Sequence, residues 1–406
     1  MMRSVVLLLL CVGIAAAQKP YELLLKGGHL IDPKNAINAP RDVAITKGKI
    51  AAVGENLDPD QADKIVDVSG LYVMPGLVDI HAHVFTGTGR KGVLTGDTSV
   101  YPDGFSFRAG VTTLVDVGSS GRRNFEEFKR LIIDRAQTRV LSMLNIVGGG
   151  MGGGKIEQNV DDMEPALTAQ MVKKYPDIIV GIKTAHYAGP EWVAVDRAVE
   201  AGKLGKVPVM VDFGTFREER PFEELVLEHL RPGDMYTHFF IGRVPMLDDE
   251  GKVRPYLYEA RKRGVKFDVG HGSGSFWWSQ AVPAVRQGFL PDSISTDLHT
   301  GSMNSGMKNM SNVMSKFLSL DVPLEEVVRL STWNPSQQIQ RPDLGHLTVG
   351  AEADVAVMRV DTGKYGFLDI RNARYDGTKL LVPELTLRAG RVMWDLNGRA
   401  GTPWEN

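Results

Sequence analysis

Two histidines two residues apart follow an apolar run early in the chain, Val73-Met74-Pro75-Gly76-Leu77-Val78-Asp79-Ile80-His81-Ala82-His83. Side chains at positions i and i+2 of a strand point the same way, so the imidazoles of His81 and His83 can bind one cation. A pair of solvated or hydrogen-bonded histidines would show the same spacing. The choice between the two interpretations depends on what the rest of the chain provides.

The centre of the chain alternates short apolar runs with stretches of helical pattern. Residues 125–136 and 192–202 are two of the helical stretches. Counting residues 77–81, the runs number eight, and the others are 111–116, 140–145, 178–183, 207–212, 235–238, 265–271 and 293–297. This alternation predicts an α/β fold, a (β/α)8 TIM barrel. Active sites of such barrels lie at the carboxyl ends of the strands. Polar residues at those ends are therefore expected to converge on one mouth, and they are His81, His83, Lys183, Asp212, His238, His271 and Asp297.

Both ends of the mature chain consist of short alternating stretches separated by Gly, Pro and Asn turns, which is typical of antiparallel sheet. We expect one small composite β-sandwich domain assembled from both termini. The predicted organisation is a signal peptide at 1–17, the first β-sandwich segment at 18–75, the barrel at 76–345 and the second β-sandwich segment at 346–406.

The first 17 residues have a positive start, a short apolar run and small residues before a cleavage point after Ala17, the pattern of a secretory signal peptide. An exported protein, periplasmic or secreted, with no stable membrane association after cleavage is the expectation. An uncut membrane anchor is the alternative, but the apolar run is short for a bilayer. The single cysteine, Cys11, lies in this segment, so the mature chain offers no thiol as a metal ligand.

Composition describes a folded protein with a large core, because 43% of the 406 residues are hydrophobic and 24% are charged. The formal net charge is −2. A chain without a basic surface is not expected to bind nucleic acid or an anionic membrane. A small-molecule substrate is the expected partner, and homo-oligomers are common among such barrels.

Four motifs together resemble the amidohydrolase superfamily of metal-dependent hydrolases. They are the Pro-Gly-x-x-Asp-x-His-x-His run ending at His83, Gly181-Ile182-Lys183, Thr237-His238, and Ser295-Thr296-Asp297-Leu298-His299. The stretches 270–276 and 291–297 further resemble the amidohydrolase/deacetylase branch, whose members are often called dihydroorotase-like. Members of the superfamily are barrels with a composite β-sandwich, in agreement with the pattern above.

The resemblance implies a role for each strand-end residue. His81 and His83 would bind the first ion, His238 the second, and Asp297 would both bind the first ion and carry a proton. Lys183 would be carboxylated and bridge two divalent ions, zinc first, with Mn, Co or Fe as alternatives. Lys183 as a snorkelling or ion-paired barrel lysine is the other interpretation.

One position departs from the branch, where a histidine usually ends strand five and this chain has Asp212. A carboxylate is an acceptable zinc ligand, so Asp212 can bind the second ion itself. Alternatively, His186 supplies the imidazole and Asp212 orients it. The departure concerns the second ion more than the first.

The expected reaction is attack by a metal-bound hydroxide on an amide or cyclic amide, with Asp297 as proton carrier. His271 is the candidate for holding the substrate or its oxyanion, and a packed structural histidine is its alternative. His299 and Tyr187 are further candidates for substrate contact. Deacetylation of an N-acyl or O-acyl small molecule is the first reaction to expect. A lactone or carboxylic-ester hydrolase and a non-catalytic metal- or metabolite-binding barrel are the alternatives.

Overall fold

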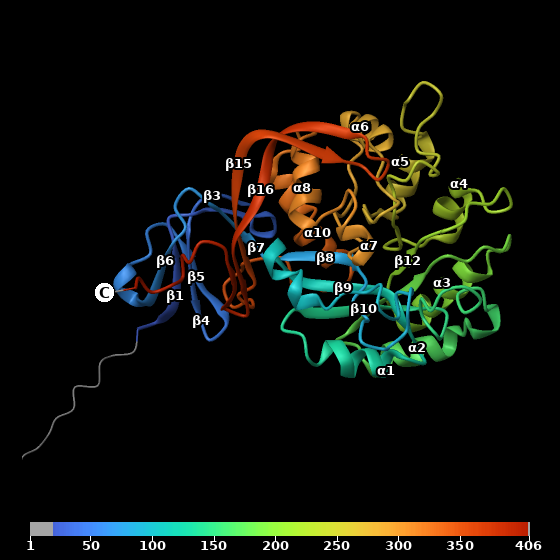
Figure 1. Cartoon of the computed structure of the whole chain (residues 1–406), viewed down its shortest axis with the longest axis horizontal. Coiled ribbons are helices and arrows are strands. Elements are labelled where there is room, and N and C mark those ends of the chain that lie inside the picture. Colours follow the sequence, from blue (N-terminus) through green and yellow to red (C-terminus); the bar gives the residue numbers. More distant parts are fainter. Residues whose placement is uncertain (1–18, 405–406) are drawn as a thin grey trace, which may run out of the picture.

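A computed structural model describes residues 19–404, so the predicted signal peptide and Cys11 lie outside the described residues. The terminal sheets lie at one end of the molecule, and a sheet ringed by helices lies at the other (Figure 1). Within the described residues, no helix is long and apolar enough to cross a membrane.

The central sheet has seven parallel strands in the order β14-β13-β12-β11-β10-β9-β8. Their apolar side chains are buried on both faces, as parallel strands covered by helices require. This is a TIM-barrel-like domain, and the expected fold class is confirmed at that level. The strands are β8 (Leu77–Ala82), β9 (Val111–Gly121), β10 (Arg139–Asn145), β11 (Ile179–Thr184), β12 (Val209–Val211), β13 (Met235–Tyr236) and β14 (Lys266–Phe267).

The predicted eighth strand is not a regular strand in the structure. Residues 293–298 make single parallel bridges to both edges of the sheet, Asp268 with Ser293 and Ala82 with Leu298. β13 and β14 are also shorter than the apolar runs predicted. Left-handed backbone at His238, Gly270 and Asp297, with φ between 45° and 61°, takes the chain out of the extended conformation at the mouth.

Helices surround this sheet, and the longest ones bury an apolar stripe against it. In α3, for example, Ala194, Val195, Ala198 and Val199 are buried at helical spacing. The helices are α1 (Phe125–Phe128), α2 (Pro165–Lys174), α3 (Val193–Gly205), α4 (Phe222–Glu224), α5 (Pro255–Lys262), α6 (Trp278–Arg286), α7 (Thr300–Met303), α8 (Met310–Leu318), α9 (Leu324–Arg329) and α10 (Trp333–Gln338). Short 3₁₀ helices span Pro33–Asn35, Pro59–Gln61, Pro102–Gly104, Phe107–Ala109 and Val160–Asp162, and π-helical turns span Lys129–Ile133 and Leu225–His229.

Two further sheets contain strands from the terminal regions. The first has the order β5-β4-β1-β6, and the second has the order β17-β16-β15-β7-β2-β3. In the second sheet, Val355 of β15 pairs with Pro75 of β7, so the two ends of the chain meet in one sheet. The strands are β1 (Tyr21–Lys26), β2 (His29–Asp32), β3 (Ile37–Pro40), β4 (Asp42–Thr46), β5 (Lys49–Gly54), β6 (Ala62–Asp67), β7 (Tyr72–Pro75), β15 (Val355–Leu368), β16 (Arg374–Arg388) and β17 (Arg391–Asp395).

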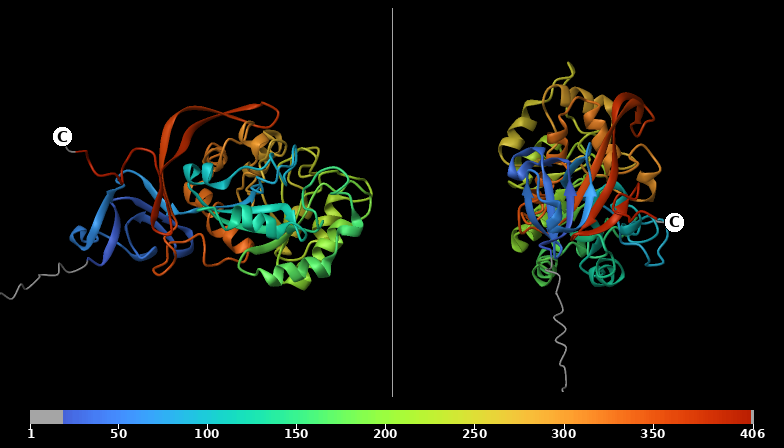
Figure 2. Two further views of the ribbon diagram at one scale, coloured as in Figure 1. Left: turned by 60° about the horizontal axis from the view of Figure 1, so that its bottom comes forward. Right: turned by 90° about the vertical axis from the view of Figure 1, so that its left-hand side faces the viewer.

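The β15–β16 hairpin extends well beyond the terminal sheet and arches over α8 toward α6 (Figures 1 and 2). The backbone N–H of Leu381 in β16 donates to Ser315 Oγ of α8 at 2.9 Å. The sequence predicted only the halves of these strands that lie in the sheet. The outer halves carry Gly, Lys, Tyr and Asp, whose strand conformation depends on the helix beneath them.

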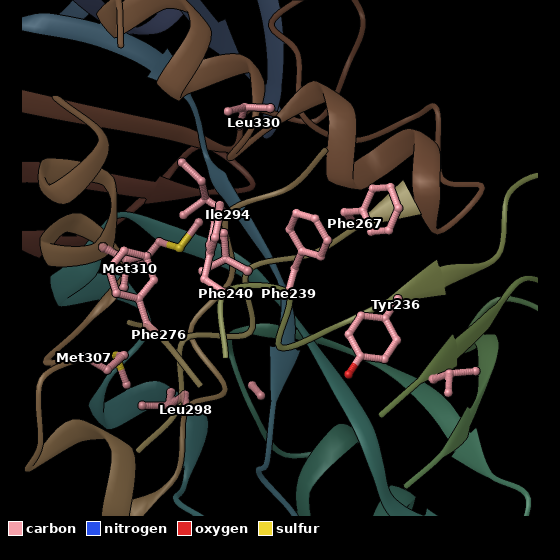
Figure 3. Packing of buried hydrophobic residues seen from close by; sticks show 14 of the residues in the cluster. Tyr236, Phe239, Phe240, Phe267, Phe276, Ile294, Leu298, Met307, Met310 and Leu330 are labelled. Carbon is pink, nitrogen blue, oxygen red and sulfur yellow. The ribbon is translucent and has the colours of Figure 1, made fainter. Parts of the chain in front are cut away.

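A buried aromatic cluster packs behind the ends of strands six and seven (Figure 3). Phe239 and Phe240 follow His238 directly, and the Phe239 ring lies 4.4 Å from that of Phe267 between centroids. Because both phenylalanines are fully buried in this cluster, they fix the chain on one side of the mouth residue His238.

Candidate metal centre and active site

A cavity of about 380 Å³ opens at the carboxyl ends of the barrel strands. Eight of the residues singled out in the sequence line it, namely His81, His83, Lys183, His186, Asp212, His238, Asp297 and His299. They come from several different strands or the loops that follow them, as the shared edge of a parallel sheet predicts.

His81, His83 and Asp297 form a compact group of possible metal ligands. Oδ1 of Asp297 lies 3.5 Å from His81 Nε2 and 3.1 Å from His83 Nε2. One atom of each of these residues lies within 4.8 Å of the others. Two imidazoles and a carboxylate at this separation suit a divalent ion such as zinc.

Hydrogen bonds on the far side of each ring orient the two histidines. His81 Nδ1 lies 2.8 Å from Thr237 Oγ1, which donates to Asp268 Oδ2 at 2.7 Å. Thr237 Oγ1 therefore accepts a hydrogen bond from His81 Nδ1, and the lone pair of His81 Nε2 faces the cavity. Burial first, and then the charge of Lys183, hold the pKa of His81 well below its usual value, so its ring is neutral.

His83 has an equivalent support. Its Nδ1 lies 2.9 Å from Ser119 Oγ, and the Ser119 backbone N–H donates to Asp116 Oδ1 at 2.9 Å. The sequence analysis assigned no role to Ser119, Asp116, Thr237 or Asp268. The one sequence feature that could have indicated these residues is a polar side chain within or at the end of an otherwise apolar barrel strand.

Lys183 is fully buried, and its Nζ has no hydrogen-bond partner among the described residues. Burial lowers the pKa of this amine. An unpaired buried amine is costly. Carboxylation would turn the same side chain into an anionic oxygen donor beside the histidines, so the orphaned Nζ and the nitrogen and oxygen donors around it fit a divalent metal centre.

A second group of donors lies beside the first. Oδ2 of Asp212 lies 3.4 Å from His186 Nε2 and 3.5 Å from His238 Nε2. His238 Nδ1 donates to the carbonyl of Gly270 at 2.7 Å, which leaves its Nε2 toward the cavity. Burial acts to raise the pKa of Asp212, but the charge and hydrogen bond of His238 outweigh it, so the pKa lies far below its usual value.

Glu157 is a site residue that the sequence analysis missed. It is buried, its Oε2 lies 2.5 Å from His186 Nδ1, and its Oε1 accepts a hydrogen bond from Gly153 N at 2.8 Å. His186 is thus held between two carboxylates, Glu157 and Asp212. No periodic pattern marks Glu157, because it belongs to the loop after strand three.

Two predicted substrate contacts do not lie on the cavity wall. His271 is fully buried, its Nδ1 donates to the Gly272 carbonyl at 3.0 Å and its Nε2 lies 2.5 Å from Lys316 Nζ. Both ring nitrogens are used, which is the packed histidine of the alternative interpretation. The hydroxyl of Tyr187 is also occupied, since it donates to Glu191 Oε2 at 2.8 Å. The polar atoms of both side chains are thus engaged by other groups of the protein.

Comparison with known proteins agrees with this geometry. The model of the amidohydrolase family matches residues 278–392. A deacetylase of Agrobacterium fabrum is 35% identical over 338 residues, which cover 80% of this chain and 79% of the relative. The chain belongs to the amidohydrolase family.

Further members of the family resemble this chain over most of its length. A deacetylase of Enterococcus faecalis is 27% identical over 92% of this chain and 99% of its own. Among solved structures, an adenine deaminase superposes with a TM-score of 0.83 at 25% identity, covering 92% of this chain and 100% of its own. A dihydroorotase superposes with a TM-score of 0.79 at 30% identity, covering 91% and 98%.

Membership confirms the resemblance inferred from the sequence motifs. It also confirms the expected class of activity, a metal-dependent hydrolase of amide or cyclic-amide bonds other than peptide bonds.

Proposed function

We propose that this amidohydrolase removes an acyl group from the nitrogen of a small molecule, with Asp297 as the proton carrier. The position of Asp297 carries the proposal. Its Oδ1 faces the Nε2 atoms of His81 and His83, while its Oδ2 lies 3.8 Å from His299 Nε2 on the cavity wall. One carboxylate therefore faces both the ligand group and the space for substrate.

We assign the first ion to His81, His83 and Asp297, and a carboxylated Lys183 would join it to a second ion. His238 would bind the second ion together with His186 or Asp212. Zinc is the first ion to test, and Mn, Co and Fe suit the same donors. When bound, such ions polarise the scissile carbonyl and make water a nucleophile at neutral pH.

The protein's own part in the reaction is to move one proton and to hold the substrate. Asp297 accepts the proton of the attacking water and delivers it to the leaving nitrogen, which needs a carboxylate within hydrogen-bond reach of both. Burial acts to raise the pKa of Asp297, but the hydrogen bond and charge of His83 outweigh it, so the carboxylate is ionised and can accept that proton.

The cavity wall indicates what kind of group it receives. Leu94, Met151, Phe216 and Ile241 provide apolar surface from four different loops. Thr98, Ser273, Ser275 and His299 provide hydrogen-bonding groups. Apolar walls with a few polar groups suit a small organic molecule and exclude water from the reacting bond.

The relatives called deacetylases support an acetyl group as the group removed, and the dihydroorotase supports a carbon–nitrogen bond over the ester and lactone alternatives. We also infer that residues 293–298 take the place of the eighth strand of a (β/α)8 barrel. The domain boundaries would be those predicted from the sequence, with the barrel at 76–345 between the two β-sandwich segments. We further infer that the protein is exported after cleavage following Ala17.

A substrate panel tests the proposed function. Protein produced with added zinc and bicarbonate would be assayed against matched N-acetyl and O-acetyl compounds and cyclic amides, with Asp297→Asn as the control. Release of acetate from N-acetyl compounds by the wild type alone supports the proposal. Preference for the O-acetyl member of each pair, or equal activity of the variant, contradicts it.

A further inference from the structure

A buried lysine connects two loops at the mouth of the barrel to the tip of the β15–β16 hairpin. Lys316 of α8 is fully buried, and its Nζ lies 2.5 Å from His271 Nε2, 2.9 Å from the Gly306 carbonyl and 2.6 Å from the Leu368 carbonyl. In its protonated form the Lys316 amine has three donors, and each one has an acceptor here. Lys316 forms no salt bridge with any residue in the range 19–404.

Such a group is expensive to bury, because its charge is lost from water without a carboxylate to replace it. An apolar residue would fill the same place at lower cost. A lysine at this position therefore indicates a role that depends on its three directed hydrogen bonds.

The first acceptor connects Lys316 to Asp297. His271 and Gly272 donate backbone hydrogen bonds to Ser295 at 3.3 Å and Thr296 at 3.0 Å, the two residues before Asp297. Gly272 has a φ of +56°, and a Cβ there would lie 2.4 Å from Asp297 Oδ2. The backbone of this loop thus packs directly against the carboxylate that carries the proton.

The second acceptor belongs to the loop that follows Asp297. Gly306 lies seven residues after His299, and a Cβ on Gly306 would lie 2.8 Å from the carbonyl oxygens of both Leu368 and Asp369. The hairpin tip therefore rests on this loop with no room for a side chain. Met307, the next residue, is buried in the cluster shown in Figure 3.

The third acceptor is the hairpin tip itself, which also contacts the far end of the strand-seven loop. Trp278 Nε1 donates to the Phe367 carbonyl at 3.1 Å, and Ile370 N donates to the Phe276 carbonyl at 3.2 Å. Asp369 accepts from Trp278 N at 3.3 Å. The two ends of the loop 271–278 are thus fixed by Lys316 and by the tip, and Ser273 to Ser275 between them line the cavity.

We propose that Lys316 is a positioning residue for the reaction, which fixes the loops after strands seven and eight against the hairpin tip and so keeps Asp297 and the wall 273–275 in place. The proposal rests on the proposed function for its catalytic consequence. It also makes the hairpin of the terminal sheet a component of the active-site architecture.

The test compares Lys316→Met, which keeps the length and apolar stem, with Lys174→Met, which removes an exposed lysine paired with Glu126. For the full-length, metal-loaded enzyme, kcat, KM and amide hydrogen exchange would be measured. Misplacement of the reacting groups should lower kcat of Lys316→Met about ten- to 100-fold, with KM changed by less than about threefold. Amide exchange should become faster at 271–278 and 304–309, and Lys174→Met should match the wild type.

An unchanged kcat in Lys316→Met overturns the proposal, whether or not exchange is faster, because faster exchange alone describes a merely structural lysine. If Lys316→Met does not fold, Trp278→Phe removes the hydrogen bond to Phe367 and reduces the ring packing on Tyr375, and it must show the same two effects in weaker form. If the wild type hydrolyses no substrate of the panel, the proposed function fails. Exchange then still decides whether Lys316 fixes the loops, and unchanged exchange overturns the inference as well.

Discussion

His186 Nε2 lies 3.4 Å from Asp212 Oδ2, although the two residues follow different barrel strands. Asp212 stands where the resemblance to the deacetylase branch predicts a histidine, and His186 brings an imidazole to the same cavity. His186 has a left-handed backbone, with a φ of +61°, and its side chain lines the cavity. The pair therefore provides the second group of donors in a rearranged form.

Replacing His186 should reveal whether this rearrangement holds the second ion. We expect His186→Ala to retain the first ion and to lose most of the second, because only His238 and Asp212 would remain. Metal content by elemental analysis measures the effect. His229→Ala is the matched control, since His229 stacks on Trp192 away from the cavity. Full metal content in His186→Ala would contradict this expectation and would indicate that Asp212, not His186, binds the second ion.

Glu157 should affect the second ion through His186. Glu157→Gln keeps the size of the side chain and removes the charge that faces His186 Nδ1 at 2.5 Å. Loss of such an orienting carboxylate typically lowers metal affinity about 10- to 100-fold. Competition with a zinc chelator measures the affinity, and Glu191→Gln is the control. Equal zinc affinities of the wild type, Glu157→Gln and Glu191→Gln would show that Glu157 stabilises only its own loop, through the hydrogen bond from Gly153.

Asp297→Asn should separate metal binding from proton transfer. The amide can still offer an oxygen to an ion but cannot accept a proton, so kcat should fall about 10²- to 10⁴-fold. Much of the bound metal should remain, as elemental analysis of the same sample would show. Turnover near the wild-type rate would remove Asp297 from the role of proton carrier.

The pH dependence of stability should report the burial of Lys316. Burial lowers the pKa of Lys316 from 10.5 to about 7 in the folded protein. The negative charge of Asp369 raises this pKa, and the positive charge of Lys308 lowers it further. Between pH 7 and pH 10.5 the unfolded chain therefore binds a proton that the folded protein has released. Because the unfolded state binds more protons, the free energy of unfolding rises with pH across this window. Below pH 7 both states are protonated and the full cost is present.

Urea unfolding of the wild type and Lys316→Met at pH 7 and pH 9.5 measures this effect. We expect the wild type to gain stability relative to the variant as pH rises. His271, which contacts Lys316, has a pKa held well below its usual value by burial and does not titrate in this window. A constant difference between the two proteins would show that Lys316 has an ordinary pKa.

The sequence was sufficient to predict the residues that end strands. His81, His83, Lys183, His238 and Asp297 lie together because parallel strands share one edge, and this follows from spacing alone. His271 and Tyr187 end or follow strands in the same way, yet their polar atoms bond to Lys316 and Glu191. Which partner a strand-end residue finds depends on packing with distant segments, and that packing leaves no local pattern.

The same reason explains the missed elements of the fold. The outer half of the β15–β16 hairpin is a strand because it lies on α8, and its own residues do not alternate clearly. Residues 293–298 have the apolar pattern of a strand, but the left-handed Asp297 interrupts the ladder at the active site. Local backbone strain at a functional residue cannot be read from residue types.

The measurement that tests the account most directly is metal content per chain, by elemental analysis of protein produced with zinc and bicarbonate, for the wild type and Lys183→Ala. The account predicts about two ions in the wild type and a clear loss in the variant, because a carboxylated Lys183 would provide oxygen ligands for both ions. One ion in both proteins would contradict it. Lys183 would then be a structural lysine, and His186 and Asp212 would lie outside the metal centre.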